Sequence, residues 1–180
     1  MRALTKSLGV MALLLVQLAH GASLDGATQS KIDAKIKEIQ SWADSPAIVD
    51  AVKKANAGPS AADMTQDKWK ALTVLDPTVR AFAKNPAAEF LKSKKGTSVA
   101  EAFVSASDGS KVAFLAKPSS WTHLGKPKHD VPMAGKTWQG AVEVDESTGL
   151  QQVQVAVPVK DGGKPIGSLV VGLSISGLTQ

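Results

Sequence analysis

The sequence has no cysteine, no tyrosine and very little arginine. The absence of cysteine excludes a disulfide framework, a thiolate metal site, covalent haem attachment through a CxxCH motif and a cysteine nucleophile. Arg80 is the only arginine after the first 22 residues. Because bidentate recognition of phosphate and guanine normally uses arginine, the sequence also argues against nucleic-acid binding.

Residues 1–22 read as a cleavable secretory signal peptide. Arg2 and Lys6 supply a positive start, a largely apolar run covers residues 10–19, and small residues follow. The alternative is an uncleaved membrane anchor, but this run is much shorter than the roughly 20 residues that a bilayer span requires. We therefore expect an exported protein, periplasmic or secreted, in which residues 23–180 form one domain.

This domain divides into a helical part, residues 28–96, and a strand-rich part, residues 97–177. Apolar residues recur at helical spacing in the first part. Ser45, Thr65 and Asp76 are residue types that begin helices, and two of them precede a proline, which favours a helix start. The pattern predicts a long first helix followed by short ones.

In the second part, alternating apolar and polar residues predict five strands joined mostly by short turns. The predicted strands are residues 99–107, 111–117, 138–144, 152–159 and a last one around 169–175. Strands joined by short turns pair in antiparallel fashion. The predicted fold class is therefore α+β, with a long N-terminal helix and short helices packed on a five-stranded antiparallel sheet.

One connection, residues 118–136, is long and has neither helical nor strand periodicity. Loops of this length in compact domains are usually functional or disordered, and this one contains both histidines found outside the leader. Tryptophans could form the wall of a pocket there, while lysines and histidines could donate hydrogen bonds to an anion. The candidate ligand-binding residues in and beside the loop are Trp121, His123, Lys126, His129, Lys136 and Trp138.

Simpler interpretations stay open for each of these residues. The tryptophans could belong to the core, the lysines to the solvated surface, and the histidines could be merely exposed. Arg80 could anchor a ligand carboxylate through its paired donors, or it could be a surface residue of a helix. His123, His129 and Asp130 match no helix-borne metal motif and could bind a metal only if the loop brings them together. We predict no metal and no cofactor.

Three segments carry a resemblance to a known family. Residues 39–52 (IQSWADSPAIVDAV), residues 142–149 and residues 157–171 (VPVKDGGKPIGSLVV) are similar to the first helix, a central strand and turn, and the final hairpin of the Cache family. These are PAS-like extracytoplasmic sensor domains of bacterial receptors. The resemblance covers most of residues 30–176. It implies a PAS/Cache-like sheet, a small ligand held between the sheet and the long loop, and a signal transmitted through the N-terminal helix.

The sequence departs from the family in two respects. Amino-acid-sensing members use a motif that contains tyrosine and often an aspartate near the end of the last strand, where this sequence has Gly172, Leu173 and Ser174. Members usually carry a cytoplasmic signalling domain, whereas this sequence ends at Gln180. We therefore expect a sensor or accessory domain that binds a small organic anion, such as a short carboxylate, and signals through a partner such as a membrane receptor.

Two other functions remain as alternatives. A catalytic site needs a nucleophile beside a base, or two converging carboxylates, and the sequence has no GxSxG elbow to support one. We therefore predict that the protein is not an enzyme. The first alternative is nevertheless a small exported hydrolase or metal-dependent protein that uses residues 118–136. The second is a structural envelope protein without a ligand.

Overall fold

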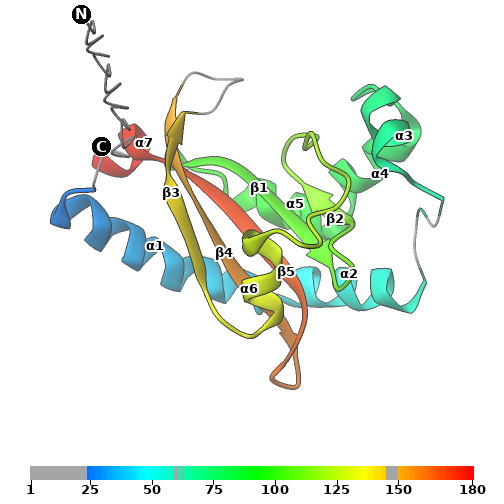
Figure 1. The fold of residues 1–180 in the computed structure, drawn as a ribbon, viewed down its shortest axis with the longest axis horizontal. Helices are drawn as coiled ribbons and strands as arrows, with labels where there is room; N and C mark the ends of the chain where they lie inside the picture. Colours follow the sequence, from blue (N-terminus) through cyan, green and yellow to red (C-terminus); the bar gives the residue numbers. More distant parts are fainter. Residues whose placement is uncertain (1–23, 59–60, 62, 145–149) are drawn as a thin grey trace, which may run out of the picture.

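The computed structural model describes residues 24–58, 61, 63–144 and 150–180. Its centre is an antiparallel sheet with helices packed on both faces (Figure 1). The predicted leader and the predicted turn at 145–149 lie outside the described residues.

Helices occupy the first part of the domain, as the sequence predicts. They are α1 (Gly26–Ala43), α2 (Pro46–Ala57), α3 (Gln66–Ala71), α4 (Pro77–Lys84) and α5 (Pro86–Lys94). Side-chain oxygens accept hydrogen bonds from unpaired backbone N–H groups where four of these helices begin, and at α5 Asn85 accepts from Ala88. Asp25 accepts from Thr28, Thr65 accepts from Lys68, and Asp76 accepts from Thr78, at nitrogen–oxygen distances of 2.7, 3.2 and 2.8 Å.

The five predicted strands are also present. They are β1 (Val99–Ala106), β2 (Lys111–Phe114), β3 (Trp138–Val144), β4 (Gln151–Asp161) and β5 (Lys164–Ser174), in the order β2-β1-β5-β4-β3 with every pair antiparallel. β2 ends three residues before the predicted end at residue 117. Ile175, predicted to lie in the last strand, instead begins the short helix α7 (Ile175–Thr179). The predicted α+β fold class is confirmed.

The two faces of the sheet are covered differently. On one face, alternate valine and leucine side chains of β1, β4 and β5 pack against α1 and α2 and form the main core. Val155, Leu169 and Val171 on the strands and Ile39 on α1 are all fully buried there. The other face is covered by the segment after β2 and by a short helix, α6 (Pro127–Met133), which packs on β3, β4 and β5 (Figure 1).

The helix α6 corrects the prediction that residues 118–136 contain no regular structure. Pro127 occupies the first helical position, where its missing N–H group is not needed. The helix ends before Gly135, whose φ of +80° suits glycine. Seven residues with prolines at 127 and 132 are too few to give a helical period, and this is why the sequence pattern does not predict the helix.

A second, smaller core lies between α3, α4 and the segment that follows β2. Trp69 is its centre, with ring centroids 5.1 Å from Trp121, 5.9 Å from Phe114 and 6.2 Å from Phe82. The indole N–H of Trp69 donates to the carbonyl oxygen of Pro118 at 2.7 Å. This aromatic cluster fixes the start of the long connection against the helical part of the domain.

Candidate functional site

The sheet face under α6 carries buried polar side chains beside the apolar Phe103, Ala156 and Val170, whereas the opposite face forms the main apolar core. Ser105 on β1 pairs with Ser168 on β5 and with Lys111 on β2. Residues paired across antiparallel strands point to the same face, so these three side chains lie together, and each is at most 1% exposed. With two histidines they form what we call the buried polar cluster: Ser105, Lys111, His123, His129 and Ser168.

Lys111 places a primary amine inside this cluster. Its Nζ lies 2.7 Å from Nδ1 of His123, 3.4 Å from Oγ of Ser105 and 4.9 Å from the centre of the Phe103 ring. The ion pairs found within the described ranges lie at the surface and leave Lys111 out: Lys35–Glu38, Lys53–Asp161 and Lys92–Glu89. Burial, reinforced by the positive charge of Lys128, lowers the pKa of Lys111 to about 7. At neutral pH the amine therefore exchanges between its charged and neutral forms.

His123 contacts the amine without neutralising its charge. Its ring stacks on Phe103, with ring centroids 4.9 Å apart and planes 20° apart. Burial and the charges of Lys111 and Lys128 lower the pKa of His123 to about 3. The ring is therefore neutral at pH 7. While Lys111 is an ammonium group, which can only donate, Nδ1 is the acceptor and Nε2 carries the proton.

The turn between β1 and β2 positions His123. The backbone N–H of His123 donates to the carbonyl oxygen of Gly109 at 3.0 Å, and Ser110 forms an isolated bridge with Thr122. Gly109 has φ of +78°, and a Cβ atom there would meet the backbone nitrogen of Leu124 and lie 2.8 Å from Oγ1 of Thr122. Only glycine allows this close contact between the turn and the segment that carries His123.

Gly109→Ala is therefore expected to destabilise the protein more than Gly125→Ala. Both glycines have φ of +78°, but a Cβ at Gly125 would have no atom within 4 Å. Gly125→Ala measures backbone strain alone, about 1–2 kcal/mol, whereas Gly109→Ala adds a collision and is expected to cost roughly 2–4 kcal/mol. Denaturant unfolding of both variants measures the difference, and equal losses would show that the turn does not pack on residues 122–124.

His129 attaches α6 to the sheet. Its Nε2 lies 3.3 Å from the carbonyl oxygen of Ser107 and its Nδ1 lies 2.8 Å from Oγ of Ser168. The carbonyl can only accept, so Nε2 carries the proton and Nδ1 accepts from the serine hydroxyl. Burial lowers the pKa of His129, while its bond to the Ser107 carbonyl acts in the opposite direction. The alternative interpretation of both histidines as exposed loop residues is wrong, because His129 is 1% exposed and His123 9%.

A polar bridge crosses the sheet beside the buried polar cluster. Lys128 on α6 donates to the side-chain carbonyl of Gln154 on β4, and the amide nitrogen of Gln154 donates to the carboxylate of Glu101 on β1. Gly172 of β5 lies between these strands, and a Cβ there would come within 2.6 Å of Cγ of Glu101. Glycine at 172 therefore makes room for the bridge, in the stretch near the end of the last strand where amino-acid-sensing Cache members often have an aspartate.

A hollow of about 160 Å³ opens beside this bridge, under α6 and against β3 and β4. It is lined by Lys128, Trp138, Gly140, Ala141, Glu143 and Gln154. The Trp138 ring lies against Gly140, where a Cβ would come within 2.8 Å of it. Lys128 and Trp138 belong to or border the predicted loop, so the hollow lies where the sequence predicts a site. Lys128, which lines the hollow, precedes His129 of the buried polar cluster in α6.

The remaining predicted site residues lie elsewhere. Trp121 is 7% exposed and belongs to the aromatic cluster around Trp69, which matches the core interpretation of this tryptophan. Lys126 precedes α6 and Lys136 follows it, and both are exposed. Arg80 is an exposed residue of α4, a helix that packs against β2 and α5. The structure thus brings together His123, His129 and Trp138 around Lys128, but not the other four residues.

The geometry also bears on the metal and hydrolase alternatives. Within the described ranges, no three histidine, cysteine, aspartate or glutamate side chains converge as metal ligands would. Asp130 instead accepts from the backbone N–H of Gly125 at 3.1 Å. Ser168 and His129 form a buried serine–histidine pair, and the second ring nitrogen of His129 is bonded to the Ser107 carbonyl oxygen.

Sequence reasoning missed Lys111, and a β-bulge explains why. Strict alternation would put Lys111 on the same face as Ala113. The register of β2 against β1 shifts by one residue, so that Lys111 opposes Ser105 while Phe114 opposes Phe103. Lys111 therefore turns toward α6. The only available signal was the charged residue at the start of an otherwise apolar strand.

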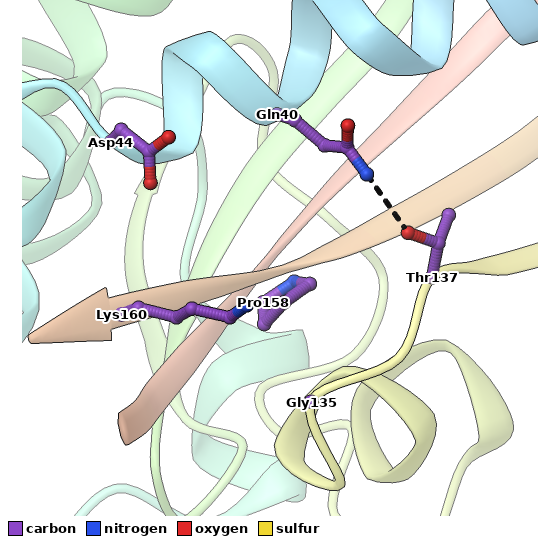
Figure 2. A pocket seen from close by; sticks show the side chains of 6 residues that line it. All are labelled: Gln40, Asp44, Gly135, Thr137, Pro158 and Lys160. Carbon is purple, nitrogen blue, oxygen red and sulfur yellow. Dashed lines mark hydrogen bonds between the residues drawn. The ribbon is translucent and has the colours of Figure 1, made fainter. Parts of the chain in front are cut away.

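A second hollow, of about 300 Å³, lies between α1, β4 and the segment that joins α6 to β3. Figure 2 shows Gln40 and Asp44 of α1 facing Pro158 and Lys160 of β4, with Gly135 and Thr137 completing the lining. Gln40 donates to the Thr137 hydroxyl at 3.3 Å. All six residues except Pro158 are exposed, and the two charged ones, Asp44 and Lys160, have opposite signs. This hollow therefore differs from the buried polar cluster, whose residues are at most 9% exposed.

No family model matches the sequence, and no curated protein is significantly similar to it. No helix in the described part of the chain is long and apolar enough to cross a bilayer.

Solved structures of bacterial sensor domains are similar in fold. The sensor domain of the V. cholerae histidine kinase DctB matches 84% of this chain with 17% identity and a TM-score of 0.50, and the chain spans 54% of that domain. The E. coli DcuS sensor domain (16% identity, 87% of this chain and 97% of that one) and the GABA complex of the Pseudomonas aeruginosa chemoreceptor PctC (14%, 85% and 57%) each give a TM-score of 0.49. Over about half the length of the DctB sensor domain, the chain therefore shares the fold of that domain, in agreement with the sequence resemblance to Cache domains.

Proposed function

We propose that this protein is an exported sensor or accessory domain that binds a small organic anion between α6 and the sheet. The observation that carries the proposal is the buried amine of Lys111, which has Lys128 nearby and no carboxylate bonded to it within the described ranges. The anion would pass its signal to a partner protein, such as a membrane receptor, in the periplasm or outside the cell.

The energetic reason is the cost of the buried amine. A charged group removed from water is costly unless an opposite charge or strong hydrogen bonds replace its hydration. The contacts of Lys111 are a neutral imidazole, a hydroxyl and an aromatic face. None of them cancels a positive charge, so a carboxylate entering beside Lys111 would supply the missing interaction.

The charges around the cluster favour an anion over a cation or a neutral sugar. Lys111 and Lys128 are basic, and among the carboxylates near them Asp108 already accepts hydrogen bonds from Ser110, while Glu143 lines the hollow on the side of β3. Glu101 accepts from Gln154, and Asp130 accepts from the Gly125 backbone. The hollow of about 160 Å³ beside Lys128 matches a ligand of few heavy atoms. Trp138 would exclude water from one side of such a ligand and strengthen its ionic contacts.

A ligand at this position would alter the attachment of α6. Lys128 holds Gln154, and an anion that binds Lys128 would compete for that bond. Because α6 contacts three strands and α1 packs on the other side of β4 and β5, a shift of α6 can reach the N-terminal helix through the sheet. This is a route for the signal that the Cache resemblance implies.

A thermal-shift screen of carboxylates, amino acids, amines and sugars tests the proposed function, followed by calorimetry on every hit. Small carboxylates are expected to raise the melting temperature by mass action. Lys128→Ala is expected to weaken binding at least tenfold, because it removes a charge-assisted contact. Lys160→Ala, which removes an exposed lysine from the second hollow, is the matched control and should leave the affinity unchanged.

Two results would contradict the proposed function. The first is a set of hits confined to amines or neutral sugars. The second is carboxylate binding that Lys160→Ala weakens and Lys128→Ala does not, since this would place the anion in the hollow between α1 and β4.

A further inference from the structure

We infer that the site takes up a proton together with its anion, and that Lys111 is the residue that receives this proton. The anion is then held as an ion pair with the Lys111 ammonium group, and the domain responds to the combination of anion and acidity. This inference rests on the proposed function and assigns the regulation of the same site.

The geometry singles out Lys111 as the proton acceptor. Its amine is 1% exposed and contacts the Nδ1 atom of His123, the hydroxyl of Ser105 and the Phe103 ring. The two histidines are less suited to the role. His123 already uses Nδ1 to accept from Lys111, and both ring nitrogens of His129 are occupied by Ser168 and the Ser107 carbonyl. A new proton on either ring would break an existing hydrogen bond.

Charged groups reach Lys111 from several elements. Asp108 in the β1–β2 turn favours the ammonium form, and Lys128 on α6 opposes it. His123, from the segment after β2, and His129 on α6 are neutral neighbours at pH 7, because burial lowers the pKa of each. On β1, Glu101 is engaged by Gln154. The remaining charged groups of α6 and its start are Lys126 and Asp130, which are exposed.

The helices packed on the outer side of β2 add no charge at this point. Asn85, which begins α5, donates to the Val112 carbonyl oxygen at 2.8 Å. The side chains of α4 and α5 that reach the cores are apolar: Val79, Phe82, Ala87, Ala88 and Leu91. The pKa of Lys111 is therefore set by burial and Lys128, which lower it, and by Asp108, which raises it. An added anion would strongly favour the ammonium form.

The direction of the pH dependence follows from this balance. With the pKa of Lys111 at about 7 in the unliganded protein, the ammonium form is the minority above pH 7. An anion that binds only this form has an apparent affinity reduced by the fraction present, so the apparent Kd rises about tenfold per pH unit above 7. Between pH 7 and pH 9 the expected weakening is about 50-fold. A histidine donor would lose its proton at lower pH, and its pKa of about 3 removes His123 from this role.

Calorimetry with sodium acetate and sodium succinate tests the inference in the intact domain. Titrations at pH 6, 7, 8 and 9, each in two buffers with different ionisation enthalpies, count the protons exchanged. The expected result is uptake that approaches one proton per anion at pH 9, together with the 50-fold weakening. Neither ligand changes its own protonation over most of this range, so the proton taken up belongs to the protein.

Two variants separate the possible outcomes. Lys111→Arg keeps a positive charge that does not titrate, and its affinity should be independent of pH; Lys111→Met should bind at least tenfold more weakly at pH 6 while giving a cooperative thermal transition. Binding by the parent protein with a flat pH profile and no proton uptake would overturn this inference and leave the proposed function standing. Absence of carboxylate binding at every pH, pH 6 included, would overturn both.

Discussion

Lys111→Met is expected to raise the free energy of unfolding at pH 7 and to lower it at pH 10.5. In the parent protein the pKa of Lys111 is about 7 when folded, against 10.5 as the ordinary value. Between these pH values the unfolded chain binds one more proton, so parent stability rises with pH by about 1.4 kcal/mol per pH unit. The methionine variant lacks this slope. The stability difference between variant and parent should therefore change by on the order of 4 kcal/mol from pH 7 to pH 10.5.

The difference in stability between variant and parent has one cause at pH 7 and another at pH 10.5. At pH 7 the variant is the more stable protein, because it no longer buries an amine that releases its proton on folding. The loss of the hydrogen bond to His123 offsets part of this effect, so the net gain in the free energy of unfolding is about 1–3 kcal/mol. At pH 10.5 only that loss remains, so the variant is the less stable protein. Urea unfolding at four pH values measures both ends, with Lys160→Met as the exposed control. A difference that stays constant with pH would contradict the burial of Lys111.

Trp121→Ala is expected to cost about 3–5 kcal/mol of stability, as large-to-small changes at buried aromatic residues do. The Trp121 ring centroid lies 5.1 Å from that of Trp69 and 5.5 Å from that of Phe82, and the residue is 7% exposed. Its loss would leave a cavity in the aromatic cluster and release the start of the segment that leads to His123. Denaturant unfolding measures this loss directly.

Trp138→Ala is the matched comparison, because it removes the same side chain from a half-buried position on β3. Its ring lies on Gly140 and lines the hollow under α6, so the expected loss of stability is less than half of that for Trp121→Ala. Carboxylate binding should respond in the opposite order, weakened by Trp138→Ala and little changed by Trp121→Ala at a temperature where both are folded. Equal stability losses would indicate that both tryptophans are core residues.

Local signals in the sequence predicted the elements well. Ser45, Thr65 and Asp76 each precede a helix as expected, and Thr65 and Asp76 accept hydrogen bonds from the first turn, whereas Ser45 makes no side-chain bond there. Alternation predicted β3 and most of β4 and β5, because strands with one face on an apolar core repeat every two residues. The turn around Gly109 was likewise recognisable from its residue types.

The site was only partly predictable, for three physical reasons. The helix α6 is too short to give a period, and its prolines point away from a helix. The register shift in β2 reverses the face to which Lys111 points, and no local pattern encodes it. His123 and His129 look like loop residues until the fold brings Ser168 and Ser107 to them from other strands. Each of these features depends on residues distant in sequence.

The candidate residues therefore separate into two groups. His123, His129 and Trp138 remain proposed site residues, joined by Lys111 and Lys128. Lys126, Lys136 and Arg80 are exposed, and Trp121 supports the site from the aromatic cluster. A surface lysine contributes little binding energy in water, whereas a buried one contributes strongly.

The position of a bound carboxylate is the most direct test of the proposed site. A crystal structure at pH 6, with the carboxylate that gives the largest thermal shift, should place its oxygens within about 3.2 Å of Nζ of Lys111 or Lys128, under α6. Density for the carboxylate only in the hollow lined by Asp44 and Lys160, or only beside the exposed Lys126 and Lys136, would contradict the proposal that the buried polar cluster binds the anion.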